Sequence, residues 1–134
     1  MSQENIDWAR RAYAAFNRGD VAGGVEDFAP EFEWVATGVV PGVEGVYRGP
    51  GEYRQFLESW WSEFEDAHLE VHDLTDAGDQ VLAALTLRGR GKQSGVETSW
   101  DIWHVWTLRN GKVVGHQVFT SQNKALEAVG LSEP

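Results

Sequence analysis

The segment His104-Val105-Trp106-Thr107-Leu108-Arg109-Asn110-Gly111-Lys112-Val113 is the most informative part of this sequence. Asn110-Gly111 stands between two runs in which apolar and polar residues alternate, and this pattern is the strongest short-range indication of a β-hairpin. We therefore predict two antiparallel strands, over residues 96–109 and 112–121, joined by a two-residue turn.

Upstream of this hairpin, two more runs, residues 68–74 and 80–90, alternate with a period of two. Turn-forming residues at positions 76–79 and 91–95 separate them, so four consecutive antiparallel strands are predicted. A short apolar and aromatic run over residues 32–36 predicts one further strand.

Helical spacing of apolar residues replaces this alternation in the first half of the chain. One apolar face runs through residues 6–16 and stops at Gly19, in the position after a helix that favours glycine. Short helices are also predicted after Asp20 and after Ser121. The strongest helical stripe follows Pro50 and comprises Tyr53, Phe56, Leu57, Trp60, Trp61 and Phe64.

Helices followed by a run of strands are typical of an α+β fold. The glycine-rich residues 37–49 are predicted to form a long loop between the two parts. We expect one domain over residues 1–134, in which a curved mixed or antiparallel sheet wraps around the N-terminal helices and encloses a pocket.

Composition excludes several classes of protein. Eleven Lys and Arg residues against 21 Asp and Glu residues give a net charge of −10, which repels nucleic acids and anionic membranes. There is no cysteine, so disulfides, thiolate nucleophiles and Cys-ligated metals are excluded. No apolar run reaches about 18 residues and the N-terminus lacks a signal-peptide pattern, so a cytoplasmic protein is expected.

Motifs for cofactors and metals are weak. The glycines within residues 42–49 and 89–95 have the wrong spacing for a dinucleotide-binding loop. His68, Glu70 and His72 alternate along one strand and offer metal-ligating atoms, but no fourth ligand accompanies them at a recognisable spacing. We therefore expect no cofactor and no metal.

Several phrases of the sequence resemble the nuclear transport factor 2-like superfamily, and in particular its SnoaL-like, ketosteroid isomerase-like branch. They are Ala12-Tyr13-Ala14-Ala15-Phe16-Asn17-Arg18-Gly19-Asp20, Phe28-Ala29-Pro30-Glu31-Phe32-Glu33-Trp34, Tyr47-Arg48-Gly49, the segment from His104 to Val113, and Ala125-Leu126-Glu127-Ala128-Val129-Gly130-Leu131. The resemblance implies a cone-shaped α+β barrel with an apolar pocket, and a homodimer formed through the outer face of the sheet. The functions it implies range from isomerisation, cyclisation, dehydration and hydrolysis of apolar small molecules to non-catalytic binding, because this fold hosts many unrelated functions.

Ketosteroid isomerase uses a carboxylate base and an oxyanion hole made by a tyrosine and a protonated aspartate. The resemblance places the base at Ala36, the tyrosine near Ala12 with Tyr13 one residue away, and the second acid at His104. None of these positions keeps the catalytic group, which argues against steroid isomerisation by that mechanism.

Successive side chains of a strand point to opposite faces, so alternation along each strand predicts which side chains face the pocket. With His104 facing inward, we expect every second residue on the neighbouring strands to face inward as well. A pocket with an apolar wall and a few polar groups is the usual form of a ligand site. Its predicted lining is Phe16, Trp34, Phe56, Trp60, Thr86, Trp106, Val118 and Thr120.

Three side chains are candidates for chemistry. His104 is expected either to transfer a proton, because histidine titrates near neutrality, or to be a hydrogen-bonded core residue. Arg88 is expected to stabilise a developing oxyanion or bind a ligand carboxylate, or else to pair with an acid such as Glu70 or Glu97 at the rim. His116 is the candidate to assist acid–base chemistry at His104. A shift of one residue in the strand would turn Asp101 inward in place of His104.

Trp103 and Val105 are expected on the outer face of the sheet, where large apolar groups indicate an interface, so we expect a homodimer. Three functions remain open. The chain is an acid–base enzyme acting on a small apolar molecule, a non-catalytic binder of such a molecule, or an interaction module whose cavity is filled by its own side chains.

Overall fold

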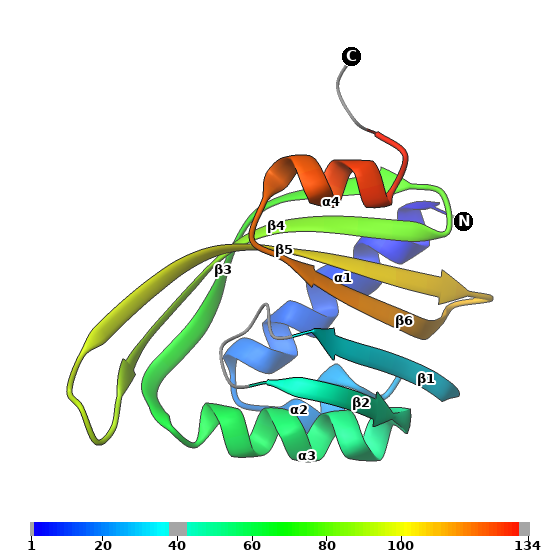
Figure 1. Cartoon of the computed structure of the whole chain (residues 1–134). Coiled ribbons are helices and arrows are strands. Elements are labelled where there is room, and N and C mark those ends of the chain that lie inside the picture. Colours follow the sequence, from blue (N-terminus) through cyan, green and yellow to red (C-terminus); the bar gives the residue numbers. More distant parts are fainter. Residues whose placement is uncertain (1, 38–42, 132–134) are drawn as a thin grey trace.

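The computed structural model describes residues 2–37 and 43–131. Within them, no helix is long and apolar enough to cross a membrane. Two helices come first, and four consecutive strands follow a third helix, which confirms the predicted α+β class (Figure 1). The elements are α1 (Ser2–Asn17), α2 (Val21–Gly24), β1 (Phe28–Thr37), β2 (Glu44–Arg48), α3 (Gly49–Trp61), β3 (Phe64–Ala77), β4 (Gln80–Gly91), β5 (Glu97–Arg109), β6 (Lys112–Phe119) and α4 (Gln122–Ala128).

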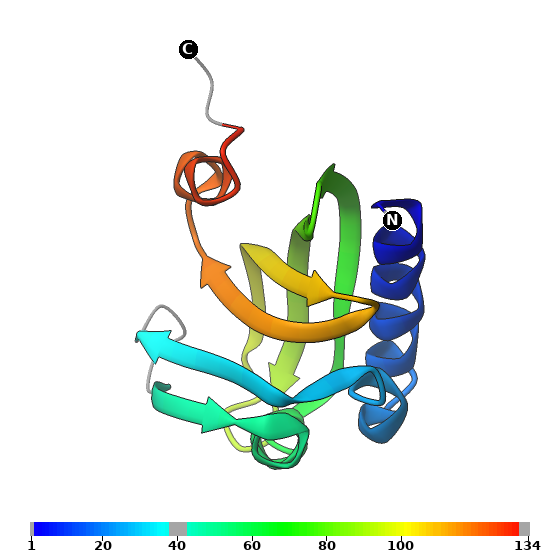
Figure 2. The same ribbon diagram turned by 90° about the vertical axis from the view of Figure 1, so that its right-hand side faces the viewer.

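The six strands form one curved sheet in the order β2-β1-β6-β5-β4-β3. Only the β1–β6 pair is parallel, so the sheet is mixed as predicted. In the described residues β2 and β3 are its two edges, and the sheet curls without closing (Figures 1 and 2). Helices α1 and α3 pack against the concave face, whereas α4 packs against the convex face.

The hairpin between β5 and β6 forms where the Asn-Gly pair predicted it. Asn110 and Gly111 adopt φ values of 53° and 78°, and the flanking residues Arg109 and Lys112 face each other across the two strands. Positive φ at both central residues is the backbone that such a tight hairpin requires, and asparagine and glycine are the residues that tolerate it best.

The region predicted as a loop over residues 37–49 contains a strand. Strand β2 pairs with β1 in antiparallel register, and the ring of Tyr47 stacks on Trp34 with centroids 5.2 Å apart. The two glycines at positions 45 and 49 concealed this strand, because glycine is depleted in strands. Residues 38–42 of the predicted loop lie outside the described residues.

The side chains of strand β4 point to the opposite faces of the sheet from those predicted. Val81 pairs directly with Trp106 of β5, so Val81, Ala83, Leu85 and Leu87 face the concave core. Leu82 instead packs on the convex side, in a small cluster with residues of α4. The alternation was ambiguous because β4 is apolar on both faces, each of which a helix covers.

The expectation that Val105 is exposed on the outer face of the sheet is wrong. Val105 is 0% exposed, because it packs with Leu82 and Ala125 beneath α4. Trp103 lies beside this cluster and is partly buried. The end of the chain therefore covers an apolar patch that the sequence predicted to be open to a partner.

Candidate functional site

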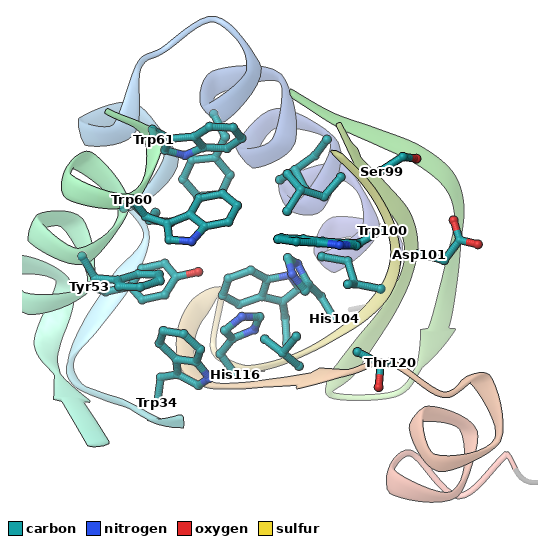
Figure 3. Close-up of a pocket in the computed structure, with 18 residues that line it drawn as sticks. Trp34, Tyr53, Trp60, Trp61, Ser99, Trp100, Asp101, His104, His116 and Thr120 are labelled. Carbon is teal, nitrogen blue, oxygen red and sulfur yellow. The ribbon is translucent and has the colours of Figure 1, made fainter. Parts of the chain in front are cut away.

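A cavity of about 440 Å³ occupies the concave side of the sheet. Helices α1 and α3 and strands β1 and β3 to β6 all contribute to its wall, and aromatic side chains dominate it (Figure 3). Its lining residues are Phe16, Trp34, Tyr53, Phe56, Leu57, Trp60, Trp61, Leu69, Leu87, Ser99, Trp100, Asp101, Ile102, His104, Trp106, His116, Val118 and Thr120.

The structure brings together most of the residues that the sequence assigned to the pocket. His104 and His116 both line the cavity, as do seven of the eight expected wall residues. The seven are Phe16, Trp34, Phe56, Trp60, Trp106, Val118 and Thr120.

Buried polar groups meet at the inner end of the cavity, around Tyr13 of α1. The Tyr13 hydroxyl lies 2.8 Å from Nδ1 of His104 on β5, and the indole nitrogen of Trp106 donates to the same hydroxyl at 2.8 Å. All three side chains are buried. One tyrosine therefore ties two neighbouring inward positions of β5 to the first helix.

His116 lies against the same group from β6. Its ring stacks on Trp106 with centroids 3.8 Å apart and meets the edge of His104 at 4.8 Å. Its Nδ1 atom is buried and has no hydrogen-bond partner among the described residues. Two imidazoles in mutual contact thus form part of the cavity wall.

Burial keeps these groups uncharged. Desolvation lowers the pKa of His104 to about 3 and, together with the neighbouring His104, lowers the pKa of His116 well below its usual value. Desolvation likewise raises the pKa of Tyr13 and Tyr53 above the usual value for tyrosine. At neutral pH the site presents neutral imidazoles and neutral phenols, and its interior disfavours charge of either sign.

Tyr53 is a polar wall residue that the sequence did not assign to the pocket. It lies in α3, and Figure 3 shows its hydroxyl pointing into the cavity. The helical stripe that contains Phe56 and Trp60 also contains Tyr53, so its face was predictable. The sequence did contain an indication of this role, because Tyr53 is a tyrosine on an otherwise apolar stripe and a buried tyrosine hydroxyl usually forms a hydrogen bond.

Arg88 and Thr86 lie on the convex face, outside the cavity lining, because β4 presents its other face to the core. The Arg88 side chain is 51% exposed and its Nε donates to Glu70 at 2.7 Å, so it takes the ion-pair alternative. The Thr86 hydroxyl donates to Asp101 at 2.7 Å and lies 2.6 Å from Nε2 of His72.

The carboxylate of Asp101 is therefore engaged outside the cavity. Figure 3 shows it pointing away from the pocket centre, although its residue contributes to the rim. Apart from the two neutral histidines and Asp101, the described lining contains no Lys, Arg or Glu side chain. Over the same residues, no group of three or more His, Asp or Glu side chains is placed to hold a metal ion.

The comparisons with known proteins bear on this site. A family model described as "SnoaL-like domain" matches residues 9–116, which contain β1 to β5, part of β6 and most of the cavity wall. The chain belongs to the SnoaL-like domain family. No curated protein matches the chain.

Solved structures similar to this SnoaL-like chain share its fold. An NTF2-like protein of unknown function from Burkholderia pseudomallei is 23% identical, with a TM-score of 0.78 and 98% of each chain covered. An NTF2-like protein from Burkholderia thailandensis is 28% identical, with a TM-score of 0.76 and 96% of each chain covered. TerC, co-crystallised with polyporic acid, is 23% identical, with a TM-score of 0.76 over 95% of this chain and 98% of that chain.

Proposed function

We propose that this SnoaL-like protein binds a small, uncharged, largely apolar molecule with one or more rings in the cavity on the concave face. The observation that supports this most strongly is the wall itself, in which aromatic side chains surround a few neutral polar groups. Such a combination is typical of small-molecule sites, where apolar area supplies affinity and the polar groups fix orientation.

The electrostatics of the cavity favour an uncharged ligand. A carboxylate or phosphate would find no lysine or arginine in the described lining, where both histidines are neutral, and an ammonium group would find no carboxylate aimed at it. Burying an unpaired charge is expensive, and the same penalty shifts the pKa values of His104 and Tyr53 toward their neutral forms.

The dimensions of the cavity fit a molecule of two to four fused rings. Its volume of about 440 Å³ lies in the range of small-molecule pockets. Indoles at steep angles to one another, such as Trp60 and Trp61 at 74°, provide both face and edge contacts for a ring. The fold of TerC accommodates polyporic acid, which supports a small organic ligand here.

An enzyme acting on such a molecule is the second candidate, and the contact between His104 and His116 at the cavity wall favours it. With its lowered pKa, His104 is a weak general base. Its catalytic contribution would instead be a neutral hydrogen bond to an oxygen that gains negative charge. A turnover assay on ring ketones, with His104→Phe as the inactive comparison, tests this alternative.

We also propose a homodimer through the convex face, with Trp103 at the contact and Val105 excluded from it. Trp103 is only partly buried at the side of the Leu82–Val105–Ala125 cluster, so a partner can cover it further. Light scattering of the wild type and of Trp103→Glu tests the assembly. A wild-type monomer at micromolar concentration would refute it.

The binding proposal is tested with an uncharged polycyclic dye, Nile red, whose fluorescence rises in an apolar site. We expect saturable binding of the dye to the wild type. Leu87→Trp places a bulky indole in the cavity wall and should bind the dye much more weakly. The matched variant Val96→Trp adds the same ring at an exposed turn position and should bind like the wild type. Equal binding by both variants would place the dye elsewhere and refute the proposal.

An unbiased experiment identifies the natural ligand. The purified protein is denatured, and the released small molecules are analysed by mass spectrometry, with Leu87→Trp purified in parallel. We expect an uncharged ring compound that is enriched with the wild type and depleted with the variant.

A further inference from the structure

The hydrogen bonds around Tyr13 have a definite direction. An indole nitrogen only donates, so the Tyr13 oxygen accepts from Trp106 at 2.8 Å. The single hydroxyl hydrogen of Tyr13 is then free for one acceptor, and the nitrogen at hydrogen-bond distance is Nδ1 of His104, also at 2.8 Å. The chain of donors thus runs from Trp106 through Tyr13 to His104.

The reverse arrangement is disfavoured. If Nδ1 of His104 carried the hydrogen, both neighbours would donate to the Tyr13 oxygen, and its own hydroxyl hydrogen would need another acceptor. Tyr13 is only 2% exposed, and the described residues offer it no other hydrogen bond. A buried donor left without a partner is costly, so the structure selects the first arrangement.

We infer that Tyr13 and Trp106 are positioning residues that hold His104 with its hydrogen on Nε2, so that the cavity selects ligands by an acceptor oxygen, such as a ring carbonyl, and rejects ring N–H groups at that point. This inference rests on the proposed binding function. Nε2 is the ring nitrogen that His104 has left to present to the cavity it lines.

The selection is assigned to His104, since Tyr53, another polar residue of the wall, is adaptable. The Tyr53 hydroxyl, which Figure 3 shows pointing into the same space, can rotate to donate or to accept. A fixed Nε2–H donor cannot adapt in this way. The favoured ligands are therefore uncharged cyclic ketones, quinones or lactones, and a ring amine of the same shape is disfavoured.

Nitrogen-15 NMR of the imidazoles tests the positioning role without any ligand. At neutral pH we expect His104 of the wild type in the neutral Nε2–H form, and a mixture of the two neutral forms in Tyr13→Phe, which removes the donor. Tyr47→Phe is the matched control, because Tyr47 lies outside the cavity lining, and it should leave the signals of His104 unchanged. A wild-type His104 that carries its hydrogen on Nδ1, or on both nitrogens, would overturn the inference.

Three tricyclic probes of nearly equal shape test the selection: fluorenone carries an acceptor oxygen, fluorene carries neither group, and carbazole carries an N–H donor. For the wild type we expect fluorenone to bind most tightly and carbazole most weakly, with about a tenfold difference between these two. In Tyr13→Phe the difference should fall to about threefold or less.

His104→Gln supplies a second variant should Tyr13→Phe fail to fold: its amide presents either a donor or an acceptor, so the preference for fluorenone over carbazole should fall to about threefold or less. Carbazole binding as tightly as fluorenone to the wild type would refute the selection. If none of the probes binds, the proposed function fails for ligands of this size, and the selection fails with it. The NMR result then still decides whether Tyr13 and Trp106 position His104.

Discussion

The four histidines of this chain divide between the two faces of one sheet, and the two pairs live in different surroundings. His104 and His116 face the concave side, where both are buried among aromatic rings. His68 and His72 lie on the exposed surface of β3, among charged and hydroxyl side chains of β4 and β5. The same residue type becomes a neutral wall group on one face and a solvated surface group on the other.

The charges of the molecule follow the same division. The Arg88–Glu70 ion pair and the Thr86–Asp101 hydrogen bond lie on the convex face. In the described part of the chain the cavity itself is lined by no lysine or arginine, and its one acidic residue points away. The net charge of −10 therefore belongs to the surface and keeps polyanions away, while the site remains neutral.

The largest expected effect comes from removing a ring on the concave face. Trp106 is 1% exposed and packs against Trp8, Phe28 and His116. Trp106→Ala should lower the free energy of unfolding by about 3–5 kcal/mol, measured by urea denaturation. Trp103→Ala makes the same change at a partly buried convex position and should cost about 1–2 kcal/mol. An equal loss of unfolding free energy in the two variants would contradict the tighter packing of the concave face.

Acid should weaken the concave face through its histidines. The pKa of His104 is about 3 in the folded state and about 6.5 in the unfolded chain, so below about pH 6.5 the unfolded chain binds more protons. The free energy of unfolding should therefore fall as the pH falls, by up to about 1.4 kcal/mol per pH unit for this residue, until about pH 3. In His104→Gln this part of the slope should disappear.

A control separates this titration from general loss of packing. Ile102→Val trims a buried neighbour on the same face of β5 and should cost about 0.5–1.5 kcal/mol at every pH, with the wild-type slope. If His104→Gln also keeps the wild-type slope, His104 is not the neutral buried group described above.

The smallest effect should come from the convex ion pair. Arg88 holds the pKa of the Glu70 carboxyl below its usual value, through a hydrogen bond and its charge, but both side chains are exposed to solvent. Arg88→Ala should therefore change stability less than either change above, and should leave Nile red affinity within about twofold of the wild type. A strong loss of dye binding would mean that the convex face contributes to the site.

Much of the fold was predictable from local patterns. The Asn110-Gly111 turn set the hairpin, and the alternation of β5 correctly placed Ile102, His104 and Trp106 on one face. The resemblance to the SnoaL-like family was also correct. These features depend on short-range chemistry, which a single sequence carries.

The errors arose where a strand is apolar on both sides. In β4 the run from Val81 to Leu85 gave no clue to its orientation, because α4 covers Leu82 on the convex side. This long-range contact reversed the expected roles of Thr86 and Arg88 and removed Val105 from the predicted interface. The bonds between Tyr13 and His104, 91 residues apart in the chain, likewise depend on tertiary packing.

The central claim is that a neutral site on the concave face binds an uncharged ring compound, and the pH dependence of fluorenone affinity tests it most directly. Because the pKa of His104 is about 3, this histidine remains neutral from about pH 5 to about pH 8, and burial likewise favours the neutral form of His116. Titration calorimetry on the folded wild type should therefore give dissociation constants that agree within about twofold across this range. A change of about tenfold between the two ends, or no binding at either, would contradict the account.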